Sequence, residues 1–333
     1  MGSNALISAA AYGAGLAPLL PGRSVDEFWC DPTGSGDGRN LDHPLPTITR
    51  AIAAATSRAA SFNRSTIIHL APGEYRELVD ITKPDIFLLG SARYPGRTRI
   101  VGDGATVQPT VRVLAPNLRG FGMANIFVET GYPGSTTVAA PAIMLETDDS
   151  IGGDSSEVGA NSQNYNWSLD NVMVISDGTT TAGLLLAGAT NGRVTRCTFA
   201  GCVHGVVFAS SRTPLNTPSD VHFEEIHFRN NTTTDVNTSD ATPPTITTGT
   251  NLAEPGSDLP AMDSITWNRI YFEDVGGTPV TNYINMVGTQ INGTFFDCFF
   301  NRTVSDGTLV LLPVGVNIIG SNSPGGAVNI VGA

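Results

Sequence analysis

The chain has few charged residues, and few of those are basic. Asp, Glu, Lys and Arg make up 14% of its 333 residues, and 18 basic residues stand against 30 acidic ones, for a net charge of −12. Binding a nucleic-acid backbone requires clustered Lys and Arg, so the composition argues against a nucleic-acid partner. The apolar runs are too short, and too often broken by Gly and Pro, to cross a bilayer, so we expect no membrane partner.

Cysteine is also scarce, with four residues. Cys197 and Cys298 stand where a repeated sequence pattern requires a small apolar side chain. Cys30 has no obvious partner, and the spacing of Cys197 and Cys202 does not suit a zinc site. We therefore predict free thiols, no metal site and no cofactor.

Glycine and proline are plentiful, at 37 and 21 residues, together with abundant Thr, Ser and Asn. This composition is typical of short strands joined by tight turns. One pattern recurs, in which an apolar residue, two others, an apolar residue, one other and an apolar residue follow each other. Its six copies are Met123-Ile126-Val128, Leu169-Val172-Val174, Val194-Cys197-Phe199, Phe223-Ile226-Phe228, Trp267-Ile270-Phe272 and Phe295-Cys298-Phe300, with a partial copy at Ile86 and Leu88.

The spacing of these copies predicts the architecture. Their middle residues are separated by 46, 25, 29, 44 and 28 residues. The shorter intervals fit one coil of a solenoid, and the longer two fit either one coil with an insertion or two coils of which one is degenerate. A second apolar run follows most copies, as at 183–186 and 205–208. The sequence therefore predicts an all-β chain, a parallel β-helix whose coils bury their inward side chains against one another.

Two segments precede the predicted coils. Residues 1–30 form an extended N-terminal arm without a charge before Arg23. We expect an assembly arm, with an uncleaved leader peptide as the alternative. Its attachment residues would be Leu6, Ile7, Tyr12, Leu16, Leu19 and Leu20.

Residues 31–60 combine a turn-rich run with a helix expected over 47–60, in which Ile48, Ala51, Ile52 and Ala55 share one face. Such a helix would cap the first coil of the solenoid. Residues 61–333 are assigned to the β-helix, with surface loops inserted at 146–166 and 230–260.

The order of motifs over residues 31–90 resembles a known family. A DPTGSGDG turn is followed by PTITRAIAAA, IIHLAPGEYRE and DIFLLG. This order is similar to the opening of pectin-lyase-like right-handed β-helices, which include pectinesterases, pectate lyases and phage tailspikes. The resemblance implies a right-handed β-helix, and beyond residue 90 the coil pattern alone supports it.

The catalytic motifs of those enzymes are missing. The chain has neither the Gln-Asp-Thr segment of a pectinesterase nor the Arg-Ile-Lys element of a polygalacturonase. If the chain is an enzyme, the candidate catalytic residues are Asp148 and Asp149 in the acidic loop and His204 on a predicted turn. An acidic surface loop is more often simply solvated. Arg229 and Glu273 each follow directly on a copy of the pattern, so they could pair across neighbouring coils. Glu225 and Glu273 would then each lie beside an arginine that keeps the carboxylate ionised and unsuited to acid catalysis.

Two columns of residues should point outward from the coils. The residue before each middle position reads Arg196, Glu225, Arg269 and Asp297 over the last four copies, which predicts a ladder of alternating charges on coils about 4.8 Å apart. The residue after each middle position reads Phe127, Met173, Thr198, His227, Tyr271 and Phe299. Stacked apolar residues of this kind either bind sugar rings or pack against another subunit. We predict subunit packing, with Phe127, Met173, His227, Tyr271 and Phe299 at the interface.

These observations favour a structural role. We expect a bacteriophage protein on the virion surface, either a capsid decoration (cement) protein or a tailspike-like component. It would be a homotrimer attached through its arm to capsid or tail proteins. The alternative is a secreted lyase or glycosidase whose loops form a cleft for a host surface polysaccharide.

Overall fold

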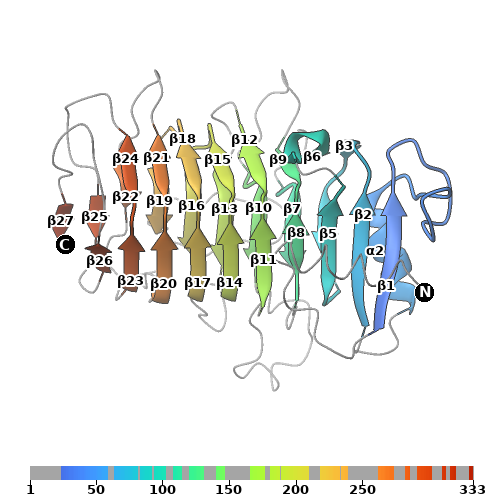
Figure 1. The fold of residues 1–333 in the computed structure, drawn as a ribbon, viewed down its shortest axis with the longest axis horizontal. Coiled ribbons are helices and arrows are strands. Elements are labelled where there is room, and N and C mark those ends of the chain that lie inside the picture. The colour runs from blue at the N-terminus through green and yellow to red at the C-terminus, as the bar shows by residue number, and fades with distance from the viewer. Residues whose placement is uncertain are drawn as a thin grey trace.

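The computed structural model describes residues 24–58, 64–81, 83–91, 94–102, 108–114, 120–130, 140–146, 166–176, 181–187, 189–209, 218–232, 234–238, 262–273, 282–285, 291–301, 310–312, 316–319 and 330–332. These residues form a solenoid of parallel strands, with helix α2 (Ile48–Arg58) at its N-terminal end (Figure 1). A single 3-10 turn, η1 (Pro95–Arg97), precedes one of the strands. The predicted parallel β-helix is confirmed.

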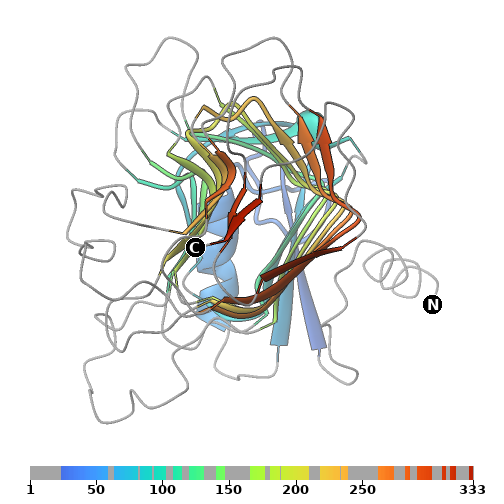
Figure 2. The same cartoon turned by 90° about the vertical axis from the view of Figure 1, so that its left-hand side faces the viewer.

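Three parallel sheets form the walls of the solenoid, and each coil from β2 to β25 adds one strand to each sheet (Figure 2). In spatial order, sheet 1 contains β1 (Ser24–Cys30), β2 (Arg64–Leu70), β5 (Ile86–Gly90), β8 (Gly122–Ala124), β11 (Trp167–Asp170), β14 (Thr190–Thr195), β17 (Ser219–Glu224), β20 (Met262–Asn268), β23 (Ile291–Phe296) and β26 (Val316–Ile319). Sheet 2 contains β3 (Gly73–Arg76), β6 (Thr98–Val101), β9 (Phe127–Glu129), β12 (Met173–Ile175), β15 (Thr198–Ala200), β18 (His227–Arg229), β21 (Tyr271–Glu273) and β24 (Phe299–Asn301). Sheet 3 contains β4 (Val79–Ile81), β7 (Val111–Leu114), β10 (Ile143–Glu146), β13 (Ala182–Ala187), β16 (His204–Ala209), β19 (Thr234–Thr238), β22 (Asn282–Asn285), β25 (Val310–Leu312) and β27 (Ile330–Gly332).

The six copies of the sequence pattern stack in register, one per coil. Their first residues are successive partners in sheet 1 and are almost completely buried: Met123, Leu169, Val194, Phe223, Trp267 and Phe295. Strand β9 pairs directly with β12, and β18 pairs directly with β21. Each long sequence interval is therefore one coil with an insertion, which excludes the alternative of a degenerate extra coil.

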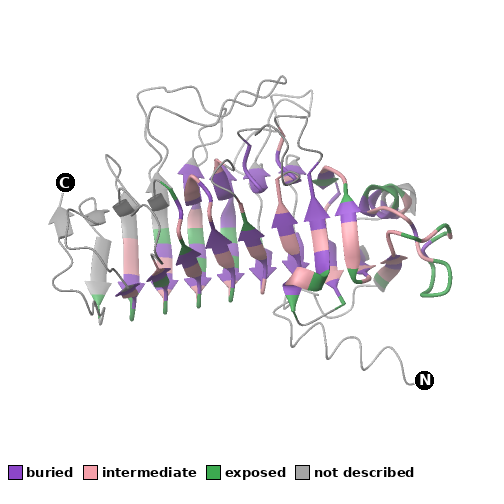
Figure 3. Ribbon diagram, turned by 90° about the horizontal axis from the view of Figure 1, so that it is seen from above, coloured by how far each residue is buried: buried purple, intermediate pink, exposed green. Residues whose placement is uncertain are grey.

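The core changes from aliphatic to aromatic towards the C-terminal coils. Trp267 lies between Phe223 and Phe295, with ring centroids 3.9 and 5.3 Å apart. In sheet 2, the rings of Phe228 and Phe272 are 5.4 Å apart and stack in the same way. Because register places the same inward position on every coil, aromatic residues in successive copies become a continuous stack. The burial colours of Figure 3 follow this inward and outward alternation along the strands.

The helix caps the first coils, as predicted from its apolar face. Its inward residues Ile48, Ala51, Ile52 and Ala55 are buried. The first backbone N–H groups of a helix have no partner within the helix. Here the Glu77 carboxylate, which follows β3, accepts hydrogen bonds from the backbone N–H of Ile48 at 2.7 Å and of Thr49 at 2.9 Å. A carboxylate at a helix N-terminus also interacts favourably with the helix dipole, so Glu77 fixes the cap to the coil beneath it.

Two predicted segment limits differ from the structure. Strand β1 lies inside the predicted arm 1–30 and pairs along its whole length with β2, because Phe28 and Cys30 add their buried side chains to the core. Strand β19 lies inside the predicted loop 230–260 and pairs with β16 and β22. Pairing with these two neighbours continues the ladder of sheet 3 and outweighs the loop-like composition of the segment. The predicted arm residues Leu6, Ile7, Tyr12, Leu16, Leu19 and Leu20 lie outside the described residues.

All four cysteines are buried free thiols. Burial raises the pKa of both Cys30 and Cys197 to about 12. Since the thiolate is the reactive form, these side chains act as core residues.

We expect none of the four thiols to react with Ellman's reagent at pH 8 in the native protein, and all four to react after denaturation. Both burial and the raised pKa of Cys30 and Cys197 suppress the thiolate. The measurement is the thiol count with and without guanidinium. A thiol that reacts rapidly in the native state would contradict the assignment of these residues to the core.

Phe295 and Phe296 are adjacent in β23 but lie on opposite faces, since Phe295 is fully buried and Phe296 is 39% exposed. Phe295→Ala should lower the free energy of unfolding by about 3 to 5 kcal/mol, because it removes a ring stacked on Trp267 and leaves a cavity. The matched Phe296→Ala variant should change it by about 0.5 kcal/mol or less. Urea denaturation of both variants tests the register, and equal losses would show that it is wrong.

Candidate interaction surface

The predicted outer column is a continuous ladder on the outer face of sheet 2. Its members are successive register partners on six coils: Phe127, Met173, Thr198, His227, Tyr271 and Phe299. Their side chains alternate with fully buried inward residues of the same strands, so the ladder points away from the core. Tyr271 is the most open member, at 52% exposure, and the other five are half-buried. We call this set the outer ladder.

Charged residues close the N-terminal end of the outer ladder. Arg99 is the register partner of Phe127, and its guanidinium carbon lies 5.2 Å from the centre of that ring. The same guanidinium pairs with Glu74 at 3.3 Å and with Glu129 at 2.5 Å. The cation therefore contacts an aromatic face while both of its carboxylate partners come from the same chain.

The C-terminal end of the outer ladder combines aromatic rings with a second charged cluster. The Tyr271 ring lies 6.3 Å from the His227 ring and 5.8 Å from the Phe299 ring. His227 Nε2 is 2.7 Å from a carboxylate oxygen of Glu273. Arg229 approaches the same carboxylate at 3.8 Å, which confirms the predicted pairing of Arg229 with Glu273 on the neighbouring coil.

A sharp corner joins sheets 1 and 2 in each of these coils. One residue per corner has a left-handed backbone, with φ between 49° and 58°: Asn125, Asn171, Arg196, Glu225, Arg269 and Asp297. Asparagine tolerates this conformation better than most residues. In the first two corners the Asn171 side-chain amide donates a 2.7 Å hydrogen bond to the Asn125 side chain on the coil before it. The corner thus fixes which residue of each coil turns outward.

The predicted alternation of charges at the corner is confirmed for one pair and corrected for another. Arg269 pairs with Glu225 on the preceding coil at 2.9 Å. Arg196 instead donates from Nε at 2.9 Å to Asp170, which is nearly buried and also accepts a 2.9 Å hydrogen bond from the Thr195 hydroxyl. The hydrogen bond to Asp170 raises the pKa of Arg196. Sheet 1 therefore supplies the closer acceptor for this guanidinium.

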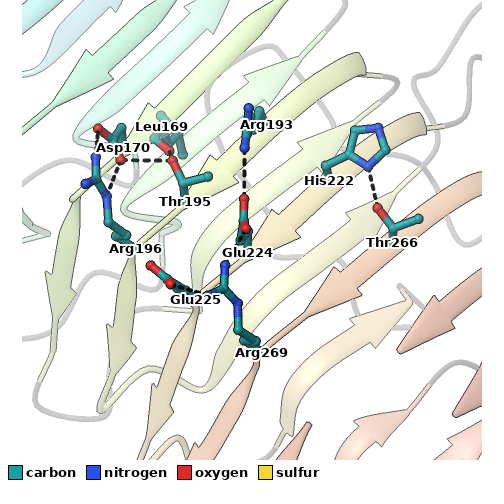
Figure 4. A network of polar contacts seen from close by, with 10 residues as sticks. All are labelled: Leu169, Asp170, Arg193, Thr195, Arg196, His222, Glu224, Glu225, Thr266 and Arg269. Carbon is teal, nitrogen blue, oxygen red and sulfur yellow. Dashed lines mark hydrogen bonds and ion pairs between the residues drawn. The ribbon is translucent and has the colours of Figure 1, made fainter. Parts of the chain in front are cut away.

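Glu224 lies between two guanidinium groups on the outer face of sheet 1 (Figure 4). The repeated sequence pattern does not mark it as a functional residue. Arg193 reaches it at 2.8 Å and Arg269 at 2.5 Å from neighbouring coils. Hydrogen bonds from Arg193 and Arg269 lower the pKa of Glu224. Its position was available from the sequence, since Glu224 directly follows the inward Phe223 and must therefore point outward.

The chain is similar to known proteins in its structure, but not in its sequence. No family model and no curated protein matches the chain. Among solved structures, Escherichia coli YbhC has a TM-score of 0.55 at 12% identity, covering 92% of this chain and 86% of that one. A rhamnogalacturonan lyase has a TM-score of 0.50 at 9% identity, covering 90% of this chain and 74% of the other. Tailspike protein 2 of the Escherichia coli O157:H7 bacteriophage CAB120 has a TM-score of 0.43 at 12% identity, covering 86% of this chain and 36% of that one.

The chain has the fold of the pectin-lyase-like right-handed parallel β-helices. The resemblance read from residues 31–90 is confirmed. Because all identities are low, the likeness concerns the fold and not the activity.

Of the three candidate catalytic residues, the described part of the chain contains His204 alone. Asp148 and Asp149 lie outside the described residues. His204 is the first residue of β16 rather than part of a turn, because its backbone continues the ladder of sheet 3, and its register partners are Ala182 and Thr234. No group of three or more His, Cys, Asp or Glu side chains in the described ranges could hold a metal ion. No helix among the described residues is long and apolar enough to span a membrane.

Glu224→Gln tests the charge network on sheet 1. A carboxyl whose pKa is lower in the folded state adds stability above its unfolded pKa, near 4.5, and loses it as the pH falls through the folded pKa. The variant should therefore be less stable than wild type at pH 7 by up to about 1 kcal/mol. This difference should vanish well below pH 4.5 and shrink in high salt. Asp220→Asn, an exposed change in the same strand, is the control and should leave urea unfolding unaltered at both pH values.

Proposed function

We propose that this chain is a structural component of a bacteriophage virion surface, either a capsid decoration protein or a tailspike-like component, assembled as a homotrimer. The observation that carries the proposal is the outer ladder, which presents apolar or weakly polar side chains on six consecutive coils. An ordered strip of this kind on a rigid wall suits a permanent protein contact.

The charges that flank the outer ladder also favour contact with another protein. Arg99 pairs with Glu74 and Glu129, and Glu74 also pairs with Arg76, so two cations balance two carboxylates of the same chain. At the other end, Glu273 has both His227 and Arg229 beside it. Burying a charge is costly unless it is already paired. A partner of the outer ladder therefore needs to supply no counter-charge at either end.

The regular spacing of the outer ladder favours a partner surface with the same spacing. Side chains that recur once per coil, about every 4.8 Å, pack best against a surface with the same repeat. A second copy of this chain in parallel alignment provides that repeat. Three copies around an axis parallel to the solenoid would each present the outer ladder towards its neighbours, in keeping with the closed symmetry of most homo-oligomers.

The same features argue against acid catalysis on the outer faces of sheets 1 and 2. Glu224, Glu225 and Glu273 each pair with an arginine, and a glycosidase requires one carboxylate whose surroundings keep it protonated. The virion assignment rests on the motif order of residues 31–90, which phage tailspikes share, and on the N-terminal arm, uncharged before Arg23, that would attach the trimer to capsid or tail proteins.

Sedimentation equilibrium at pH 8 should give three times the 34.8 kDa chain mass. Tyr271→Asp should weaken the assembly at least about tenfold, because it places a charge in the contact. Phe296→Asp, an aromatic-to-acid change on the outer face of sheet 1, is the matched control and should leave the assembly intact. A wild-type monomer would contradict the trimer.

The enzyme alternative has its own test. Wild-type protein should release no reducing ends and no unsaturated products from host capsular polysaccharide. Turnover that is lost in Asp148→Ala or Asp149→Ala, with folding unchanged by circular dichroism, would overturn the structural assignment.

A further inference from the structure

The outer ladder contains one imidazole, that of His227. His227 is the fourth of the six members, with Thr198 on one neighbouring coil and Tyr271 on the other. It is half-buried, and its Nε2 is 2.7 Å from Glu273. Imidazole is the side chain that gains a proton between pH 5 and pH 8. A contact built on this surface therefore includes this imidazole.

The charged groups around His227 determine what its protonation does. Among the described residues of β15, β18 and β21, Glu273 and Arg229 are the charged side chains on this face, and they pair with each other at 3.8 Å. With neutral His227 the cluster of His227, Arg229 and Glu273 has no net charge, and with protonated His227 it carries one positive charge.

The added proton affects the single chain and the assembly differently. In a free chain the imidazolium keeps its hydrogen bond to Glu273 and remains partly in contact with water. In a parallel trimer the same coil of each subunit faces the common contact, so the three clusters would gain like charges in a region removed from water. Like charges placed together across an interface are unfavourable, and so is the desolvation of an added charge.

We infer that the His227–Glu273–Arg229 cluster makes subunit association through the outer ladder dependent on pH, with a stable trimer at pH 8 and dissociation on acidification towards pH 5. This inference rests on the proposed trimer and adds its regulation. Each subunit should remain folded on acidification, because protonated His227 keeps Glu273 of its own chain as a partner. The effect of the added proton is therefore on association between subunits.

Sedimentation equilibrium of the full chain at pH 8, 6 and 5 tests the inference. The dissociation constant should rise at least about tenfold between pH 8 and pH 5. In His227→Gln the dissociation constant should not change with pH, because glutamine can hydrogen-bond to Glu273 but gains no proton. His222→Gln, on the outer face of sheet 1, is the matched control and should retain the wild-type pH dependence.

Glu273→Gln gives an independent check at a single pH. It leaves Arg229 without its carboxylate, so the cluster carries a positive charge already at pH 8. The variant should therefore dissociate at pH 8 as wild type does at pH 5, with circular dichroism confirming that it remains folded.

The outcomes separate the two proposals. A wild-type monomer at every pH would overturn both the trimer and its regulation. A wild-type trimer of unchanged affinity at every pH would overturn the regulation alone. If His227→Gln kept the full pH dependence, another group would be responsible and this assignment would be wrong.

Discussion

The structure depends above all on parallel hydrogen bonding between coils in strict register. The backbone N–H groups of His227, Tyr271 and Phe299 donate to Cys197, Ile226 and Ile270, each one coil earlier, at 2.8 to 2.9 Å. This bonding places equivalent residues directly above one another. Every inward position therefore sees the same position of the next coil, and every outward position becomes part of a column. Core stacks, corner ladders and the outer ladder are consequences of this one constraint.

Register also explains how a chain with few charges can tolerate them in its corners. Arg196, Glu225, Arg269 and Asp297 adopt a left-handed backbone that disfavours most residues other than glycine and asparagine. The adjacent coil supplies a partner at a fixed separation, as Glu225 does for Arg269. In the first two corners an asparagine pair fulfils the same role through a side-chain hydrogen bond. The conformational cost at each of these corners is thus offset by contacts that only stacking makes available.

Much of the fold could be predicted because the β-helix repeats its physical constraint along the chain. The spacing of Val194, Cys197 and Phe199 identified inward positions correctly, and the residue after Cys197 was correctly placed in an outward column. The prediction that failed concerned a single segment, which was assigned to a loop. β19 has a composition close to that of a loop, and its strand character comes from pairing with β16 and β22, which no short window contains.

Side-chain partners between coils were harder to predict than positions. Arg196 was expected to alternate with Glu225, yet it pairs with Asp170, because the Asp170 carboxylate is nearly buried and accepts its hydrogen bonds from Thr195 and Arg196. An unpaired carboxylate there would be far more costly than an exposed one at the corner. The choice of partner was therefore decided by burial, which the repeat pattern does not encode, and not by alternation of sign.

The distribution of charge bears on function more directly than the fold does. A β-helix wall can carry catalytic carboxylates only if some of them escape neutralisation by the next coil. On sheets 1 and 2 of this chain Glu224, Glu225 and Glu273 have guanidinium partners, while the column between the charged ends of the outer ladder is apolar or weakly polar. Ion pairs within the chain lower the electrostatic cost of burying this surface against a second protein. The regular repeat favours a partner surface with the same repeat. In the proposed parallel trimer, the same regularity would place the His227 side chains of all subunits at one height, so a charge added to one coil would be added at that height in every subunit.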